Sequence, residues 1–379
     1  MRVCRSLVRR LPALLALVVV LLAVAWHYLR RNRKPLTLFD IPGRIGWVQE
    51  CTSPSPTATE FFEMMNDYES DVSSLHPDVD ATSWLPLKLP GLARSMPAFE
   101  LWQSDGALVE RAGHALIEVE HEKKEKRASL QPIELEQKRR ISLRDFAGQY
   151  RKEEIYAVAA IPQELRPDVL LPPFFDCSPA YLYTTSSRMW WGHGPISSVL
   201  HTDNVDNLHC LLSGEKRWLL TMPGCGWERT GEYSRVDPHA VDLNEFPCFA
   251  NRSWFEAVLK PGDCLFVPHE WAHQVETTGR SISFSINLMP FHRLHSWQMS
   301  ELDGCCGAPQ SIPLSECNFT ASWHFHPRRA SSCAGARVPP FSPMERKQLA
   351  ELAPPEFFSA FMEEHESVWR GTRDDHAAG

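Results

Sequence analysis

Hydrophobic and polar residues alternate at short intervals between residues 180 and 292, where turn residues separate short apolar runs. Short strands at close spacing are typical of a small antiparallel barrel or jelly roll. We find no internal repeat of 20 to 50 residues that would indicate another architecture. The predicted strands cover residues 180–186, 189–193, 197–203, 208–223, 264–268, 273–278 and 281–290, and the run at 208–223 is expected to fold back at Ser213-Gly214 as a hairpin.

Helical patterns occur mainly outside this region. Residues 141–152 have a 3.6-residue pattern that places Leu143, Phe146 and Tyr150 on or near one face. The mixed-sign charged run at 120–140 predicts a solvated loop or exposed helix. Other predicted elements are a helix from about Glu60, a helix followed by a strand at 109–120, a strand at 154–162, a short helix within 161–175, and helices around 342–352 and 355–369. The expected fold class is therefore mainly β with flanking helices.

These patterns divide the chain into four regions. The expected regions are an N-terminal signal anchor or signal peptide at 1–34, a linker with short helices at 35–90, the β-rich domain at 91–295, and a Cys/Pro-rich loop with C-terminal helices at 296–379. The 13 Trp and 19 Phe provide large apolar side chains for a folded core. The 30 prolines favour short strands and irregular loops over long helices.

The N-terminal region contains an uncharged apolar run from Leu11 to about Tyr28, with four basic residues on each side. Such a run can cross a bilayer core as one helix, which predicts a single-pass membrane anchor. A cleaved signal peptide is the alternative, because Ala23-Val24-Ala25 offers a small-residue cleavage site. Either interpretation sends the remainder of the chain into the secretory pathway.

Two further features favour a luminal or extracellular location, in the endoplasmic reticulum, the Golgi or outside the cell. Asn251-Arg252-Ser253 and Asn318-Phe319-Thr320 are glycosylation sequons, which predicts a glycoprotein. Ten of the 11 cysteines follow the predicted anchor and could pair in an oxidising lumen, although buried free thiols are the alternative. A bridged C-terminal loop is expected from the crowding of Cys305, Cys306, Cys317 and Cys333.

Charge argues against a nucleic-acid partner. The first 34 residues carry eight basic and no acidic residues, so the remainder has 31 basic and 47 acidic residues and a formal net charge of −16. A body with this balance has no general attraction to phosphate backbones.

Costly polar groups interrupt the apolar strands of the central region. His201 and Asp203 are two residues apart, so on a strand both side chains would leave the same face. A third ligand could come from His269 or His273. Two imidazoles and one carboxylate on one side of a metal suit non-haem Fe(II) and oxygen chemistry.

Lys216 follows the predicted turn and could bring an ammonium group close to this pair. An inward-facing lysine requires an anion, and a carboxylate co-substrate would provide one.

Three stretches resemble the cupin-like branch of the JmjC-domain family of Fe(II)- and 2-oxoglutarate-dependent oxygenases, which includes the asparaginyl hydroxylase of hypoxia-inducible factor. They are HTDNVDNLHCLLSGEKRWLL at 201–220, LKPGDCLFVPHEWAHQVE at 259–276 and SISFSINL at 281–288. The resemblance covers about residues 90–295 and implies a double-stranded β-helix with a metal at its mouth.

The resemblance also implies roles for single residues. The metal ligands would be His201, Asp203 and His273, with His269 left as a loop residue near the entrance. Lys216 would bind the distal carboxylate of 2-oxoglutarate, assisted by Ser198 and Tyr156. The amides of Asn207 and Asn287 match positions that face the active site, and both could instead be ordinary strand residues.

The function implied is that of a dioxygenase that uses Fe(II), 2-oxoglutarate and O₂ to hydroxylate a protein or peptide side chain; a demethylase fits a luminal domain less well. The alternative is a catalytically silent, membrane-tethered scaffold. A zinc hydrolase is disfavoured because no H-E-x-x-H helix is present. A homodimer remains open.

Other aromatic and basic residues of this region have no implied role in catalysis. Trp190, Trp191, Trp218 and Trp271 are expected to pack within the barrel. Arg280 is expected to be a solvent-facing charge, and His209 has no assigned role.

Overall fold

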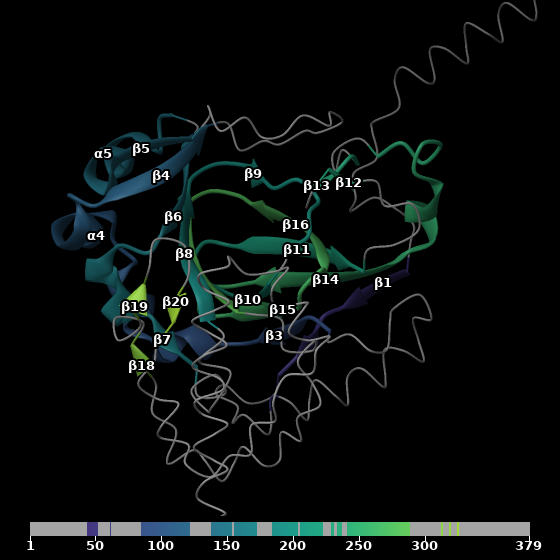
Figure 1. The fold of residues 1–379 in the computed structure, drawn as a ribbon, viewed down its shortest axis with the longest axis horizontal. Helices are drawn as coiled ribbons and strands as arrows, with labels where there is room; N and C mark the ends of the chain where they lie inside the picture. Colours follow the sequence, from purple (N-terminus) through teal and green to yellow (C-terminus); the bar gives the residue numbers. More distant parts are fainter. Residues whose placement is uncertain are drawn as a thin grey trace, which may run out of the picture.

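Two facing β-sheets form the centre of the computed structural model of this chain (Figure 1). The structure describes residues 44–51, 61, 85–121, 138–153, 155–172, 184–203, 205–222, 229–230, 233–236 and 241–288, and the two-residue strands at 312–313, 318–319 and 324–325. The predicted membrane segment, Cys-rich loop and C-terminal helices lie outside the described residues, as does the helix predicted from Glu60 except for Phe61. None of the helices in the described ranges has both the length and the apolar character needed to span a membrane.

The smaller sheet has five strands and the larger has nine. The smaller sheet runs in the order β1 (Arg44–Trp47), β14 (Ser253–Leu259), β11 (Lys216–Thr221), β16 (Ala272–Thr277) and β9 (Ile196–Ser197). The larger sheet runs in the order β2 (Gln49–Glu50), β3 (Leu87–Leu89), β15 (Cys264–Val267), β10 (Asp206–Ser213), β17 (Ser281–Leu288), β8 (Thr184–Gly192), β6 (Ile155–Ala160), β4 (Leu116–His121) and β5 (Lys138–Ser142). This is a mainly β structure of the cupin or jelly-roll kind, as predicted.

The hairpin predicted within 208–223 is wrong, because its two strands belong to different sheets. β10 pairs with β15 and β17, whereas β11 pairs with β14 and β16. The turn at Gly214 therefore carries the chain from one sheet to the other. Gly214 has φ 91°, and a Cβ there would lie 2.3 Å from the carbonyl oxygen of Arg280, so a side chain does not fit.

Several other predicted elements are present with altered bounds. The strands predicted at 180–186 and 189–193 form the single strand β8 in the described residues. The solvated loop or exposed helix predicted at 120–140 is wrong at both described ends, because residues 120–121 belong to β4 and residues 138–140 to β5, which pairs with β4.

The helices and strands predicted at 109–120 and at 141–175 are confirmed in type. Residues 109–120 contain the end of α4 (Asp105–Ala112) and most of β4. α5 (Leu143–Gln149) buries Leu143 and Phe146, and the strand predicted at 154–162 is β6. The short helix is the 3-10 helix η4 (Gln163–Asp168).

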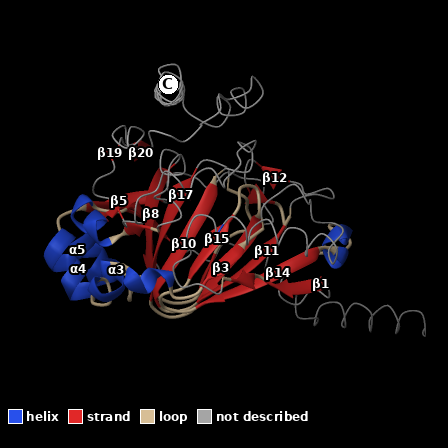
Figure 2. Cartoon of the chain, turned by 90° about the horizontal axis from the view of Figure 1, so that it is seen from below, coloured by secondary structure: helices blue, strands red, loops and turns tan. Residues whose placement is uncertain are grey.

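Helices cover one face of the larger sheet, on the side away from the smaller sheet (Figure 2). These helices are η2 (Leu92–Ser95), α3 (Pro97–Leu101), α4, α5 and η4. Strand β17 shows why this arrangement forms. Ile282, Phe284, Ile286 and Leu288 are fully buried in the core beneath the helices, and the residues between them face the other way.

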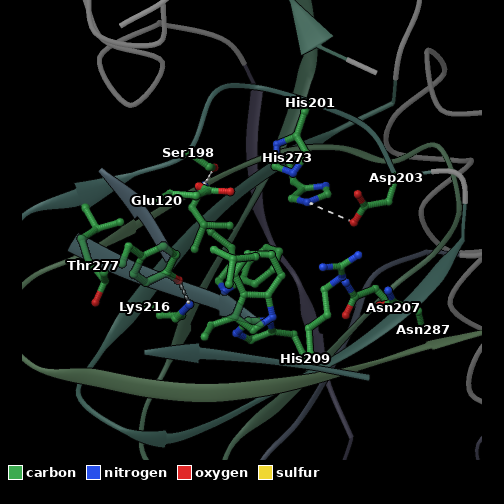
Figure 3. Close-up of a pocket in the computed structure, with 17 residues that line it drawn as sticks. Glu120, Ser198, His201, Asp203, Asn207, His209, Lys216, His273, Thr277 and Asn287 are labelled. Carbon is green, nitrogen blue, oxygen red and sulfur yellow. Dashed lines mark hydrogen bonds and ion pairs between the residues drawn. The ribbon is translucent and has the colours of Figure 1, made fainter. Parts of the chain in front are cut away.

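A second core fills part of the space between the two sheets. Leu211 and Leu265 of the larger sheet pack there with Trp218, Phe255 and other residues of the smaller sheet. The rest of this space is a polar cavity (Figure 3). Apolar packing therefore closes the barrel on one side and leaves the other for a ligand.

The two faces of β17 explain why a polar cavity can exist beside a well-packed core. Its apolar residues lie under the helices. On the other face, Ser285 accepts a bond from Trp190 Nε1 at 3.0 Å and Asn287 lies opposite Asn207. Trp190 and Asn207 both line the cavity. The free energy gained on the helix-covered face offsets the cost of polar groups on the other. The larger sheet can therefore hold a ligand site on one face and the main core on the other.

A disulfide joins Cys210 and Cys264, which lie opposite each other on the paired strands β10 and β15. Both residues are buried in the core beneath the helices. Cys248 is also disulfide-bonded. The C-terminal cysteines for which a bridged loop was predicted lie outside the described residues.

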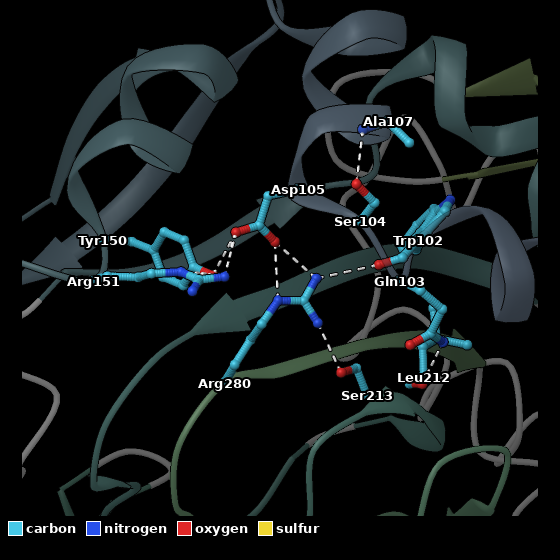
Figure 4. Close-up of polar contacts among 10 residues, drawn as sticks. All are labelled: Trp102, Gln103, Ser104, Asp105, Ala107, Tyr150, Arg151, Leu212, Ser213 and Arg280. Carbon is cyan, nitrogen blue, oxygen red and sulfur yellow. Dashed lines mark hydrogen bonds and ion pairs between the residues drawn. The ribbon is translucent and has the colours of Figure 1, made fainter.

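Arg280 is not a solvent-facing charge, contrary to the prediction. Its guanidinium contacts Asp105 Oδ1 through Nε at 2.9 Å and through Nη2 at 2.8 Å (Figure 4). It also donates to Ser213 Oγ at 2.7 Å and to the carbonyl of Trp102 at 3.4 Å. These bonds tie the turn before β17 to the start of α4, because the fork of an arginine can hold several acceptors at once.

The carboxylate of Asp105 has further donors. Tyr150 donates its hydroxyl at 2.8 Å and Arg151 donates at 2.9 Å. Partial burial alone would raise the pKa of Asp105, but hydrogen bonds from Tyr150 and Arg280 lower it below the ordinary 3.8. A lowered carboxyl pKa stabilises the fold above about pH 3.8, and this contribution is lost as the pH falls through the folded-state pKa.

We therefore expect Arg280→Ala to lower the free energy of unfolding by about 2 kcal/mol at neutral pH, since it removes charge-assisted bonds from a mostly buried network. The difference from the wild type should shrink below pH 3.8, where the carboxyl becomes protonated in the unfolded chain. Urea unfolding measured from pH 3 to pH 7 tests both points. Arg140→Ala is the control, because its exposed pair with Glu118 contributes little; an equal loss in both variants would contradict the role of Arg280.

Candidate functional site

The polar cavity lies between the two sheets and has a volume of about 260 Å³. Its lining includes residues from β4, β6, β8, β10 and β17 of the larger sheet and from β11 and β16 of the smaller sheet. Such a concave site with convergent polar groups suits a small ligand. All eight residues predicted for the site from the sequence line it: His201, Asp203, His273, Lys216, Ser198, Tyr156, Asn207 and Asn287.

His201, Asp203 and His273 come together at one end of the cavity (Figure 3). Each offers a ligand atom, and these three atoms lie within 4.8 Å of one another. His273 Nε2 is 3.8 Å from Asp203 Oδ2. Two imidazole nitrogens and one carboxylate oxygen at these separations fit a metal ion bound on one face, which leaves coordination positions open on the other.

The backbone aligns the two histidines. His201 and His273 form an isolated antiparallel bridge, in which each amide donates to the other carbonyl, at 3.1 Å from His201 and 2.8 Å from His273. Their ring centroids are 4.2 Å apart. Of the strand predicted at 197–203, only Ser197 belongs to a strand and His201 forms the isolated bridge, so most of that prediction is wrong. Asp203 lies beyond the bridge and outside any strand, and its carbonyl accepts a bond from the amide of Glu270 at 3.0 Å.

Hydrogen bonds select the ring nitrogen that each histidine presents. His201 Nδ1 lies 2.7 Å from the carbonyl of Val199, and His273 Nδ1 lies 2.9 Å from the carbonyl of Trp271. A carbonyl can only accept, so each Nδ1 carries its hydrogen and donates. Each Nε2 then keeps a lone pair for a metal, which is how metal-binding histidines are usually oriented.

Burial keeps His273 in the neutral form that a metal requires. Burial and the neighbouring His201 lower the pKa of His273 to about 4, against the opposing effects of Asp203 and the Trp271 carbonyl. The imidazole is therefore unprotonated at neutral pH. His269 is also buried, but it does not line the cavity, and its amide donates to Asp206 Oδ1 at 2.7 Å. Of the two histidines considered for the third ligand, the structure brings His273 to the cluster.

Lys216 lies in the same cavity and is only 3% exposed. Its ammonium donates to the hydroxyl of Tyr156 at 3.4 Å and lies 5.9 Å from the ring centroid of Trp190. Ser198 also lines the cavity, and its hydroxyl oxygen accepts a bond from the amide of Val275 at 2.9 Å. An ammonium and two hydroxyl groups around one space are suited to a carboxylate.

Tyr156 is held as a neutral phenol. Burial, followed by the negative charge of Glu120, raises the pKa of Tyr156 well above its ordinary value. Gly192 makes room for the ring, since a Cβ at this position would lie 2.5 Å from Tyr156 Cδ2 and 2.6 Å from Ile196 Cδ1. The absence of a side chain at residue 192 thus helps to position this hydroxyl.

Asn207 and Asn287 are cross-strand neighbours on β10 and β17. Asn287 donates its amide to Ser186 Oγ at 2.8 Å. Asn207 Oδ1 is buried and lacks a hydrogen-bond partner among the described residues. Leaving a buried acceptor unsatisfied is costly, so this oxygen is consistent with a ligand that completes the site.

Four polar residues that line the cavity were not predicted for the site from the sequence, namely Glu120, Arg188, His209 and Thr277. His209 is two residues after Asn207 on β10, so the period of two could have placed it on the same face. Its pKa is lowered well below the ordinary value by burial, and further by Lys216 and His273. Its Nε2 lacks a hydrogen-bond partner in the part of the chain that the structure describes.

The four tryptophans predicted to pack in the barrel divide into two pairs. Trp191 and Trp271 are fully buried in the two cores. Trp190 and Trp218 are part of the cavity wall, and Trp218 also belongs to the second core. The ring of Trp218 stacks on His273, with centroids 5.3 Å apart, so it packs directly against the metal-binding cluster.

Comparisons with known proteins agree with this geometry. The family model for the cupin-like domain matches residues 81–293. The chain is 26% identical over 223 residues to the Jumonji C domain-containing protein 5 of Drosophila melanogaster, an alignment that covers 53% of each chain. It is 28% identical over 130 residues to lysine-specific demethylase 8 of Xenopus tropicalis, covering 32% of this chain and 29% of that protein.

A third relative carries a different activity in its name. The chain is 30% identical over 154 residues to the tRNA wybutosine-synthesizing protein 5 of Danio rerio, covering 40% of this chain and 44% of that protein. The matched part spans about half or less of the length of these curated relatives. The similarity therefore gives information about a shared domain rather than about the whole protein. The cupin-like match covers more than half of the residues, and two of the similar proteins are a Jumonji C domain-containing protein and a lysine-specific demethylase. The chain therefore belongs to the cupin-like JmjC-domain family, which includes Fe(II)- and 2-oxoglutarate-dependent oxygenases and demethylases.

Proposed function

We propose that this protein is an Fe(II)- and 2-oxoglutarate-dependent dioxygenase that hydroxylates a side chain of a protein in the secretory pathway. The observation that carries the proposal is that one cavity contains both a two-histidine, one-carboxylate cluster and a buried lysine. The cluster alone would also suit a zinc site, and a buried lysine alone would also suit an ion pair of the core. Together they match the two requirements of such an enzyme, a metal with open positions and a cation for a dicarboxylic acid.

Fe(II) would be held by His201, Asp203 and His273. When bound there, iron supplies the activation of O₂ that is coupled to the conversion of 2-oxoglutarate to succinate and CO₂ and to the insertion of oxygen into a C–H bond. The protein holds the ligand nitrogens in place through the Val199 and Trp271 carbonyls. Positioning of this kind removes the need to order the ligands during the reaction.

The lysine end of the cavity would orient the co-substrate. Lys216 would bind its distal carboxylate, with Tyr156 and Ser198 as hydroxyl donors. Trp190 and Trp218 line the cavity, where the Trp190 ring lies 5.9 Å from Lys216 Nζ and the Trp218 ring stacks on His273. Asn207 offers an acceptor and a donor to a group bound near the metal.

Three features support a luminal, membrane-anchored enzyme. The Cys210–Cys264 disulfide is of a kind that persists in oxidising compartments and is rare in the cytosol. The apolar run at 11–28 and the two sequons would serve the same location. In a lumen, the substrate would be a secretory protein rather than a histone or a tRNA, and the net charge of −16 beyond residue 34 also disfavours nucleic acid.

A silent binding module, tethered to the membrane, is the second candidate. Glu120 favours it, because this carboxylate already lines the part of the cavity that a co-substrate carboxylate would occupy. The retained metal cluster favours the enzyme, since three inward-facing ligands are costly to keep without a metal.

The first test replaces one metal ligand. Asp203→Ala should weaken Mn(II) or Fe(II) binding by at least tenfold and abolish succinate formation from 2-oxoglutarate, while the circular dichroism spectrum stays unchanged, because two imidazoles alone bind a divalent ion poorly. Calorimetry with Mn(II) and an anaerobic Fe(II) titration with 2-oxoglutarate, followed by visible absorption, measure binding. Glu245→Gln, an exposed carboxylate outside the cavity, is the control. A wild type that binds metal without forming any succinate would favour the silent module.

The second test separates the two ends of the cavity. Lys216→Met should raise the KM for 2-oxoglutarate by about tenfold to a hundredfold, the loss expected from one charge-assisted bond. The concentration of Fe(II) needed for half-maximal activity should change little, because Lys216 is not part of the metal cluster. Lys260→Met, which removes an exposed lysine outside the cavity, is the control. Equal effects on iron and 2-oxoglutarate would disagree with this assignment.

The third test addresses the compartment. The full chain, expressed in cells, should lose mass on endoglycosidase treatment, and Cys210 and Cys264 should resist alkylation until the protein is reduced. Gel mobility and mass spectrometry of alkylated peptides measure these two properties. Asn251→Gln and Asn318→Gln variants show which sequon carries the glycan. A protein without a mobility shift and with both thiols alkylated would point to the cytosol.

A further inference from the structure

Glu120 is a buried carboxylate that the proposed reaction does not use. It belongs to β4, is 8% exposed and lines the cavity together with Lys216, Tyr156 and Ser198. Figure 3 shows its carboxylate pointing toward Ser198, on the same side of the cavity as Lys216. An acidic side chain is almost never buried to this degree without partners of opposite charge or hydrogen-bond donors.

Sheet register brings Glu120 to the lysine end. Glu120 and Tyr156 are directly opposite each other in the β4–β6 ladder, which places their Cβ atoms about 5 Å apart. The Tyr156 hydroxyl in turn lies 3.4 Å from Lys216 Nζ. The negative charge of Glu120 is strong enough at Tyr156 to raise the pKa of that phenol. Carboxylate, phenol and ammonium therefore form one connected cluster.

The cluster already contains a carboxylate, which is the group that a bound dicarboxylic acid would place near Lys216. The distal carboxylate of such an acid needs an ammonium and hydroxyl donors, and Glu120 offers its own carboxylate to the same side of the cavity. Two carboxylates close together repel each other unless one is protonated or moves away. A ligand carboxylate at Lys216 must therefore displace the Glu120 carboxylate or bind against its field.

We propose that Glu120 is an internal competitor for the Lys216 subsite and that it sets the affinity of the cavity for dicarboxylic acids. The identity of the physiological dicarboxylate rests on the proposed function; the competition itself does not. The wild-type protein then binds dicarboxylates weakly, and loss of the negative charge at residue 120 improves binding.

The experiment measures ligand binding rather than turnover. Glutarate, which lacks the 2-oxo group that would chelate a metal, is titrated calorimetrically into metal-free protein, and 2-oxoglutarate is titrated into protein loaded with Mn(II). Glu120→Gln should tighten glutarate binding by tenfold or more. Adding Lys216→Met to this variant should remove the gain. Glu120→Ala repeats the measurement, should the glutamine variant fold poorly.

Glu118→Gln is the matched control, because Glu118 lies two residues away on the same strand, pairs with Arg140 at the surface and is not part of the cavity. Unchanged or weaker glutarate binding in Glu120→Gln overturns the proposal, as does an equal gain in Glu118→Gln. A gain for glutarate in a protein that does not bind 2-oxoglutarate with Mn(II) upholds the competitor role and rejects the dioxygenase. Tight binding of 2-oxoglutarate by the wild type, with no gain in glutarate binding in Glu120→Gln, rejects the competitor role and leaves the dioxygenase proposal standing.

Discussion

The antiparallel bridge between His201 and His273 is the contact on which the site depends. It joins the segment after β9 to β16, at a point where the pairing of β9 with β16 has otherwise ended. Two reciprocal amide–carbonyl bonds hold the two Cα atoms side by side, and each ring is then fixed by a bond to the carbonyl two residues before it. Because these constraints come from the backbone, the geometry of the metal cluster does not rely on the metal alone to order it.

Local pattern predicted much of this arrangement. Short apolar runs between turn residues located β6, β10, β11 and β17, and the His201–Asp203 spacing together with the stretch from Pro268 to His273 pointed to the residues that the structure brings together. The family prediction is confirmed. These predictions succeeded for one reason: strand patterns and motifs depend only on residues that are close together in the sequence.

The errors concern partners that lie far apart along the chain. A tight turn between two apolar runs predicts a hairpin, but the turn at Gly214 joins two sheets, and the choice depends on which other strands compete for pairing. The exposure predicted for Arg280 is wrong because its partner, Asp105, lies 175 residues earlier. Glu120 is missed for the same reason, since it stands where a charged run begins, and only the sheet register reveals that it lies opposite Tyr156, whose hydroxyl contacts Lys216.

Charge links the two ends of the cavity. Apart from imidazoles and the phenol, its ionisable lining consists of Lys216 and Arg188 against Glu120 and Asp203, so these formal charges cancel. A dicarboxylate alone would add two negative charges to this balance, and a divalent metal alone would add two positive ones. Bound together they restore it. Electrostatics in this cavity therefore favours joint occupancy by metal and dicarboxylate over binding of either one. Glu120 is necessary for this balance, because a neutral residue in its place would leave a cation that attracts anions even without a metal.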